Sequence, residues 1–283
     1  MNNLVLRDKI KNGILKTLLN IFFIFLTVFA IYPVFWMIYS SLKSEKQFNT
    51  DIIGLPTELH FENYASAIKI GHLDTYLFNS IYVTLVCVVL IVVFSFLVAY
   101  FINRFTFRGR RLIYGLFMMG MMIPVHGFLV PLYIQFSRLD MTNEWFSLFL
   151  PITAFNLPLS MILIENFLKG ISFEIEESAL IDGASLGQRL SYVVLPMCAP
   201  ILATITILSF LWVWNEYPFA LVMITADKLK TLMLGISNFR GERSTQYPQM
   251  FAALTMVCIP IIVVYSAFSQ RIMQGMTAGA VKG

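Results

Sequence analysis

Acidic and small residues are concentrated in one stretch of a chain that is otherwise mostly apolar. This stretch is residues 176–196, with the sequence EESALIDGASLGQRLSYVVLP. It carries Glu176, Glu177, Asp182 and Arg189, whereas the 283-residue chain as a whole is 58% hydrophobic and only 13% charged. Carboxylates in such a stretch can accept hydrogen bonds from a partner's arginine or from nearby backbone N–H groups. The chemistry offered here is recognition. We call this stretch the polar segment.

Small residues also recur in the polar segment at a regular interval. Ala179, Gly183 and Gly187 are four residues apart, so at helical spacing they share one stripe, which would let another surface approach the backbone. Two glycines cost a helix roughly 1 kcal/mol each relative to alanine, so close approach or a turn must be needed there. We expect a short helix-turn unit shaped to fit a groove. Composition alone leaves a merely solvated loop open as the alternative.

Few other ionisable residues fall inside apolar windows. Glu165 precedes Lys169 by one turn, which favours an i,i+4 ion pair. Glu216 lies in an apolar window, where we prefer a hydrogen-bonded carboxylate inside a bundle to a solute-lining or gating role. For His126 we prefer a satisfied interior histidine to one that lines a cavity.

Several classes of chemistry lack their motifs. The chain has no G-x-x-x-x-G-K-[ST] phosphate loop, no H-E-x-x-H and no nucleophile elbow. We therefore expect no catalytic residues, no metal and no cofactor. Cys87, Cys198 and Cys258 share no metal-like spacing and are expected to be free. The net charge of +4 is attributed to basic residues at the inner membrane face, and not to a nucleic-acid surface.

The polar segment and the other ionisable residues named above must be positioned by helices, and long sequence windows without charged residues indicate where those helices lie. Mean hydropathy is +0.76, and each window is long enough to cross a bilayer as a helix, which takes about 20 apolar residues. Helices are expected because backbone groups in lipid must be satisfied within the segment. The sequence thus predicts an all-α integral membrane protein with six helices, at about 18–40, 77–102, 112–137, 147–168, 197–224 and 250–270. Prolines within these windows should kink them: Pro33, Pro124, Pro131, Pro158 and Pro260.

The distribution of basic residues predicts the orientation. Lysines and arginines are enriched in the N-terminal arm and in the loop that follows the second helix, which places both on the cytoplasmic side. The basic loop 225–249 would then face outward and argues weakly against this. We expect a cytoplasmic arm at 1–17, a membrane domain at 18–270 with a cytoplasmic loop at 170–196, and a cytoplasmic tail at 271–283.

The polar segment resembles the signature loop of the permease subunits of ABC importers. The matching residues have both the spacing and the position of that loop, although Ser178 replaces an alanine of the usual E-A-A opening; they are Glu177, Ala179, Asp182, Gly183, Ala184, Val193, Leu195 and Pro196. Other stretches, such as FWMIYSSLKSEKQF, MIPVHGFLVPLY, WNEYPFALVMI and the terminal GMTAGAVKG, are similar to the MalG-type permeases of carbohydrate importers. A departure is His126, where a glutamine is frequent.

The resemblance implies a type I ABC importer permease fold in a bacterial cell membrane. It implies that the chain forms half of an ATP-driven carbohydrate pathway with a second permease, two cytoplasmic ATPase subunits and an extracellular sugar-binding protein. The two rival classes are a secondary carrier, for which only Glu216 could serve, and an integral-membrane enzyme, which needs clustered catalytic groups.

The site residues implied by the resemblance form three groups. Residues expected to couple to the ATPase are Glu177, Ala179, Asp182, Gly183, Ala184, Gly187, Leu195 and Pro196. Thr277, Gly279 and Lys282 belong to a tail expected at the ATPase interface. Contacts to the binding protein or to the solute are expected from Trp214, Asn215, Glu216, Tyr217, Arg240 and Tyr247.

Overall fold

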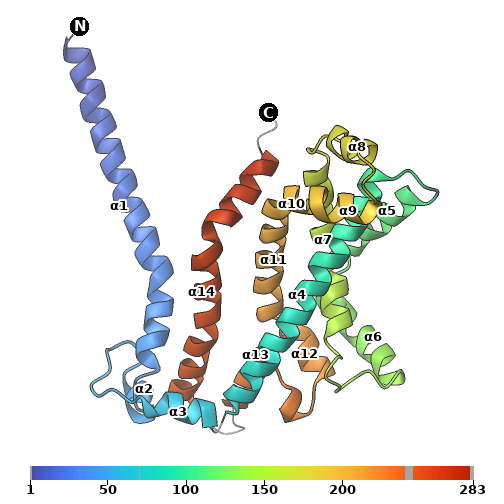
Figure 1. Cartoon of the computed structure of the whole chain (residues 1–283). Helices are drawn as coiled ribbons and strands as arrows, with labels where there is room; N and C mark the ends of the chain where they lie inside the picture. Colours follow the sequence, from blue (N-terminus) through green and yellow to red (C-terminus); the bar gives the residue numbers. More distant parts are fainter. Residues whose placement is uncertain (1, 70, 240–244, 281–283) are drawn as a thin grey trace. The chain divides into compact units, whose positions relative to one another are not determined.

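The computed structural model describes residues 2–69, 71–239 and 245–280, with side chains described from residue 13 to residue 268. Over these residues the chain consists of helices and connecting loops without a β-strand, which confirms the prediction of an all-α protein (Figure 1). It divides into two compact units, treated separately below. Unit 1 comprises residues Met1–Ile70 and Phe239–Met256, and unit 2 comprises Gly71–Asn238 and Val257–Gly283.

Unit 1 is built on a long helix, α1 (Asn2–Ser40), and two short helices, α2 (Glu45–Thr50) and α3 (Glu62–Lys69). The first turns of α14 (Tyr247–Ala280) complete it. Aromatic rings hold these elements together: Trp36 meets Phe251 edge-on at 5.0 Å, and Phe48 stacks on Tyr247 at 5.2 Å. Such ring pairs stabilise packing beyond the apolar area that they bury.

A buried lysine ties down the loop that follows α1. Lys43 is fully buried, and its Nζ donates to the carbonyl oxygens of Asp51 at 2.8 Å and Ile52 at 3.0 Å. The same ammonium lies 5.4 Å from the ring centre of Tyr39 and 5.9 Å from that of Phe48. Burial lowers the pKa of Lys43, and the Asp51 carboxylate opposes that shift in part. The loop is therefore a fixed structure.

Unit 2 holds the larger set of helices. Its main helix, α4 (Leu73–Arg104), packs against α7 (Phe149–Leu168) and α11 (Ala199–Trp214). The remaining elements are α5 (Arg110–Gly120), α6 (Val125–Arg138), α8 (Glu174–Ile181), α9 (Leu186–Gln188), η1 (Arg189–Val194), α10 (Leu195–Met197), α12 (Pro218–Met223), η2 (Asp227–Leu229), α13 (Leu232–Gly235), η3 (Ile236–Phe239) and the later part of α14.

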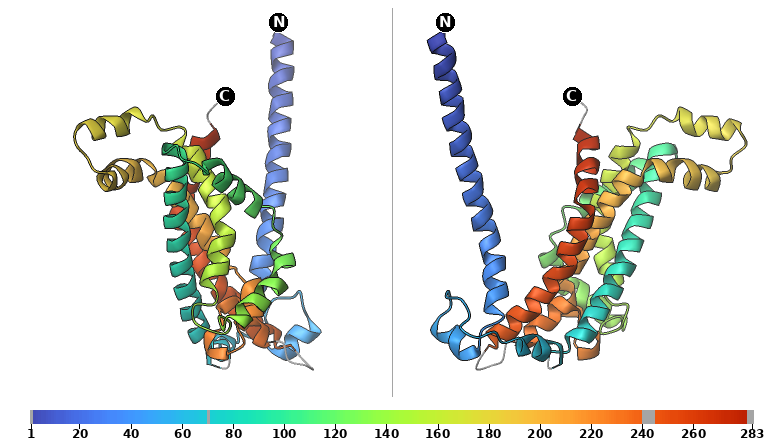
Figure 2. Two further views of the ribbon diagram at one scale, coloured as in Figure 1. Left: turned by 90° about the vertical axis from the view of Figure 1, so that its right-hand side faces the viewer. Right: turned by 60° about the vertical axis from the view of Figure 1, so that its left-hand side comes forward.

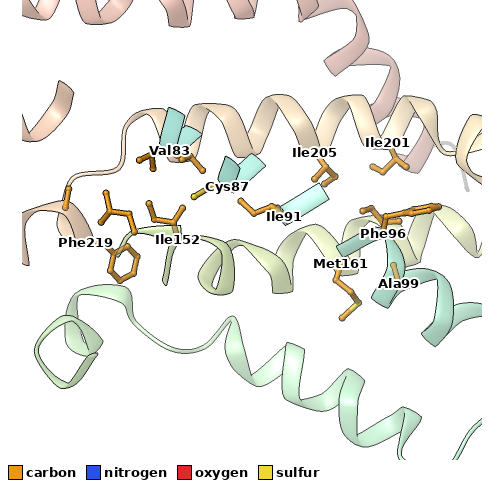
Figure 3. Packing of buried hydrophobic residues seen from close by; sticks show 14 of the residues in the cluster. Val83, Cys87, Ile91, Phe96, Ala99, Ile152, Met161, Ile201, Ile205 and Phe219 are labelled. Atoms are coloured by element: carbon orange, nitrogen blue, oxygen red, sulfur yellow. The ribbon is translucent and has the colours of Figure 1, made fainter. Parts of the chain in front are cut away.

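The core of unit 2 is apolar and lies between α4, α7 and α11. Figure 3 shows Cys87 and Ile91 of α4 close to Ile152 of α7 and Ile205 of α11, and Met161 of α7 belongs to the same buried cluster. All five side chains are buried. The apolar character that suits these helices to lipid on one side also suits them to each other on the opposite side.

Within the part of the chain that the structure describes, four helices are long and apolar enough to cross a membrane: Gly13–Ser40, Leu73–Arg104, Phe149–Leu168 and Tyr247–Phe268. Two further spans are counted only if each bent helix pair is one crossing. The pair Arg110–Gly120 and Val125–Arg138 is bent by 106°, and the pair Leu186–Met197 and Ala199–Trp214 by 75°. Four of the six expected crossings are thus continuous helices, whereas those expected at 112–137 and 197–224 are interrupted.

Prolines explain the interruptions in part. The predicted kink at Pro124 is wrong, because this residue does not lie inside a helix. It stands at the break before α6, where its missing N–H cannot continue the helix from α5. Pro218 begins α12 after the turn that ends α11. Pro33, Pro131, Pro158 and Pro260 do lie inside helices.

Polar side chains pin residues 225–235 to the start of α4. Asn79 Nδ2 donates to the carbonyls of Lys228 and Lys230, both at 2.9 Å, and Ser80 Oγ accepts from Leu232 N at 2.7 Å. Asn143 Oδ1 accepts from the backbone N–H groups of residues 225 and 226, at 3.0 and 2.7 Å. This part of the expected outer loop is therefore ordered by unit 2 itself.

Candidate functional site

The polar segment projects from the packed helices of unit 2 as two short helices joined by a turn (Figure 2). The first, α8, begins with three acidic residues in its first turn, Glu174, Glu176 and Glu177, where carboxylates interact favourably with the positive end of the helix dipole. The second run is α9, η1 and α10 and leads into α11 at the 75° bend. The expected helix-turn unit is confirmed.

The predicted stripe of small residues is wrong, because one helix does not carry all three. Helix α8 ends at Ile181, and Gly183 adopts φ +82°, a left-handed conformation that glycine adopts without steric cost. Ala184 N then bonds back to Ala179 O at 2.9 Å, which closes the helix end. Gly187 belongs to α9, on the far side of the turn.

The second helix of the polar segment starts at a reciprocal cap. Ser185 Oγ accepts from Gln188 N at 3.4 Å, and Gln188 Oε1 accepts from Ser185 N at 2.8 Å. This capping box satisfies two backbone donors that the start of a helix leaves free. Gly183 and the capping box together fix the angle between the two helices of the segment.

The turn side of the polar segment is open to solvent and mixes acidic with apolar groups. Glu177 and Asp182, for which the sequence predicts a docking role, are exposed. Within the polar segment the most exposed large apolar side chain is Ile181, at 85%, and Tyr192 follows at 78%. The sequence analysis missed both, although a Leu-Ile pair directly before Asp182 is the available signal. Of the other predicted residues, Gly183, Gly187, Leu195 and Pro196 are exposed, and Ala179 and Ala184 are half-buried.

A buried ion pair fastens α8 to the end of α4, and the sequence analysis missed it. The Glu176 side chain is 1% exposed; its Oε1 lies 2.6 Å from Arg104 Nε, and its Oε2 accepts from Tyr100 Oη at 3.0 Å. Arg104 was interpreted only as a basic residue of an inner loop. Because 72 residues separate the partners, no local spacing could have indicated the pair.

A second candidate group gathers where α11 breaks. Asn215 and Glu216 line a cavity of about 570 Å³ together with Trp212 and Asn156. The Glu216 carboxylate accepts from Phe219 N at 2.6 Å and Ala220 N at 3.1 Å, which agrees with a hydrogen-bonded carboxylate inside a bundle.

The other aromatic residues predicted beside Glu216 do not join this cavity. Trp214 is buried, and its Nε1 donates to Val257 O at 3.3 Å. Tyr217 packs against the core of unit 2. Tyr247 belongs to unit 1, where it stacks on Phe48. Arg240 and Lys282 lie outside the described residues, and Thr277 and Gly279 lie in α14 beyond the described side chains.

Three smaller predictions can also be compared with the structure. Lys169 Nζ lies 2.7 Å from Glu165 Oε2, so the i,i+4 ion pair is confirmed. His126 is exposed, so the preferred interpretation as an interior histidine is wrong; it lies in the first turn of α6, next to the break at Pro124. The cysteines are free, as expected.

Similar proteins place this architecture in a known class. Residues 91–278 match the family described as binding-protein-dependent transport system inner membrane component. A putative ABC transporter permease protein, ORF2, of Caldicellulosiruptor sp. is 34% identical, covering 93% of this chain and 96% of the relative. The sulfoquinovosyl glycerol transport system permease protein SmoH of Agrobacterium fabrum is 33% identical, covering 91% of each chain.

A solved structure agrees with these relatives. A bacterial ABC transporter involved in the import of the acidic polysaccharide alginate contains a chain that superposes with a TM-score of 0.79 at 26% identity, covering 93% of this chain and 96% of that chain. The agreement extends over both units, and the apolar helices make the protein a multi-pass membrane protein. This chain belongs to the binding-protein-dependent transport system inner membrane component family, the permeases of ABC transporters.

Proposed function

We propose that the chain is the permease subunit of a carbohydrate importer and that its polar segment docks on ATP-hydrolysing subunits. Family membership supports the first part. The cargo class is inferred from relatives, because SmoH is named for sulfoquinovosyl glycerol and the superposed transporter imports alginate. Both cargoes contain sugar units.

The exposed tip of the polar segment is the observation that carries the docking role. Ile181 is 85% exposed in a turn that also presents the carboxylates of Glu177 and Asp182. An apolar side chain rimmed by charges is typical of an interaction surface, since apolar burial supplies affinity and the charges select the partner. A purely solvated loop gives no reason for Leu180 and Ile181 to face water at its tip.

The proposed mechanism uses the polar segment as a lever. ATP binding closes the two ATPase subunits in the cytoplasm, and the docked segments of this chain and of a second permease move with them. The helix bundle then alternates between inward-open and outward-open states, with the ligand favouring one of two states. This requires the polar segment and both termini to face the cytoplasm of the bacterial cell. The boundaries 1–17, 18–270 and 271–283 stay predictions.

Other predicted residues keep subsidiary roles in the proposal. Asn215 and Glu216 are proposed to border the solute pathway, since they line the cavity at the break of α11. Arg240 and Tyr247 are proposed to contact an extracellular binding protein. The C-terminal tail is proposed to contact the ATPase subunits through three residues, Thr277, Gly279 and Lys282.

Gly187→Leu tests the docking role directly. A Cβ at Gly187 meets no atom within 4 Å, so the larger side chain should leave this chain's own fold intact while it blocks close approach by a partner. We expect tagged Gly187→Leu chain to insert in membranes at the normal level but to recover little ATPase subunit on purification. The matched control is Gly115→Leu in α5, also without neighbours within 4 Å. Full ATPase recovery with Gly187→Leu would contradict the proposal.

A further inference from the structure

The guanidinium of Arg104 joins three structural elements at the base of the polar segment. It pairs with Glu176 of α8 through Nε, donates from Nη2 to Ile171 O at 3.1 Å, and donates from Nη1 to Asn103 Oδ1 at 3.0 Å. Its Cζ also lies 5.7 Å from the ring centre of Phe173. The side chain is only 8% exposed. Arg104 therefore grips the connection between α7 and α8 as well as α8 itself.

Glu176 is bound at both of its oxygens. Arg104 binds Oε1 and the Tyr100 hydroxyl binds Oε2, so both groups that hold the carboxylate come from the last two turns of α4. The acidic neighbours Glu174 and Glu177 on the same helix are exposed. One face of α8 is thus fixed to α4 while the other remains available to a partner.

Stability alone is a weak reason for such an arrangement. Removing two charges from water is costly, and a buried ion pair is often no more stabilising than apolar groups of the same size. What the pair does supply is a fixed geometry, because a planar guanidinium with several donors holds its acceptors in defined directions. Of the four ion pairs recorded for the described side chains, this one joins helices far apart in the sequence.

Helix α4, to which α8 is bound through Arg104 and Tyr100, forms part of the core of unit 2. α4 packs along α7 and α11, and Cys87 and Ile91 in its middle are fully buried among their side chains (Figure 3). A displacement of α8 that is passed to the end of α4 therefore reaches the packed centre of unit 2. Packed cores of this kind shift as units and do not deform gradually.

We propose that Arg104 is a positioning residue that transmits movement of the polar segment to α4. The proposal rests on the proposed docking of that segment on an ATPase. Arg104 holds α8 at Glu176 and the preceding turn at Ile171, so that a force on the tip turns α4 and α8 together. Without the guanidinium the tip can still dock, but α8 is then held to α4 only by the Tyr100 hydroxyl, and much less of its movement is passed to α4.

Hydrogen exchange in the complete transporter tests this, with ATP plus vanadate to trap the ATPases closed. In the native protein we expect trapping to change amide exchange in α8 and in residues 100–105 of α4 together. Arg104→Lys keeps the charge, but its single nitrogen cannot reach the three separated acceptors that Nε, Nη1 and Nη2 of Arg104 bind. We expect the response of α8 to persist and that of residues 100–105 to fall about tenfold, the size of effect given by losing one charged hydrogen bond. Arg108→Lys, exposed in the following loop, is the matched control.

The possible outcomes separate the two proposals. A native transporter in which α8 does not respond contradicts docking. If α8 responds and residues 100–105 do not, docking stands and the transmitting role of Arg104 is excluded. If Arg104→Lys leaves both responses intact, or abolishes both, Arg104 is not the transmitting residue. Partial recovery of the α4 response in Arg104→Glu combined with Glu176→Arg, relative to either single change, would support the pairing, and no recovery would count against it.

Discussion

Residues of the same type in this protein lie in different environments, which the residue type alone does not indicate. Glu176 and Glu177 are adjacent acids in an acidic stretch, yet one is buried against Arg104 and the other is exposed. Spacing indicates which residues share a helix face, but not which face meets a helix 72 residues away. The docking role of Glu177 could therefore be proposed from the motif, whereas the pairing of Glu176 with Arg104 could be found only from the tertiary structure.

Lys43 allows a test of a buried charge at this scale. Lys43→Met removes two hydrogen bonds from a charged donor to the carbonyls of Asp51 and Ile52, and Ile52 O keeps only the bond from Trp36 Nε1 at 3.1 Å. Losing the two charged hydrogen bonds should cost about 3 kcal/mol of local stability. We expect chymotrypsin to cut the 41–69 loop of the folded protein about a hundredfold faster, following that free energy. Lys46→Met, at an exposed position of α2 within the same 41–69 segment, should change nothing. Equal cleavage of the two variants would show that Lys43 does not hold the loop.

Elements were more predictable than the joints between them. Charge-free windows identified the helices because a bilayer demands both apolar length and internal hydrogen bonding. The break between α5 and α6 was not predicted, and the turn of the polar segment was predicted without its place at Gly183, because helical spacing was assumed to continue through both positions. Gly183 and Gly187 were assigned the same purpose, yet one supplies a left-handed turn and the other lies in a helix.

These two glycines should respond oppositely to alanine. Gly183→Ala forces a side chain into φ +82°, which costs about 1 to 2 kcal/mol, so the Ala184 amide that bonds to Ala179 O should exchange about tenfold faster. Gly187→Ala should leave that amide unchanged, since alanine favours the helix. Exchange measured by NMR or mass spectrometry on the purified chain decides between them. A similar effect of both changes would refute the distinction.

The molecule has two units, and different kinds of contact stabilise each of them. The aromatic and lysine-bound contacts of unit 1 hold its loop, and the apolar core of unit 2 supports a projecting polar segment. The family and the helical class could be recognised from motifs because those motifs combine apolar length with a polar interruption. The motifs do not identify the cargo, because in the proposed pathway the solute contacts depend on how this chain faces a second permease.

The central claim is that the tip of the polar segment meets an ATPase. Ile181→Cys, labelled in native membranes with a thiol-reactive photo-cross-linker, tests it most directly. Cys87 and Cys198 are buried, and the half-buried Cys258 is replaced by serine in this variant and in its control. Ile53→Cys, 70% exposed in unit 1, is the control. We predict an adduct between position 181 and an ATPase subunit and none from position 53. Absence of that adduct from an assembled transporter, or labelling of position 181 by an impermeant reagent from outside the cell, would contradict the account.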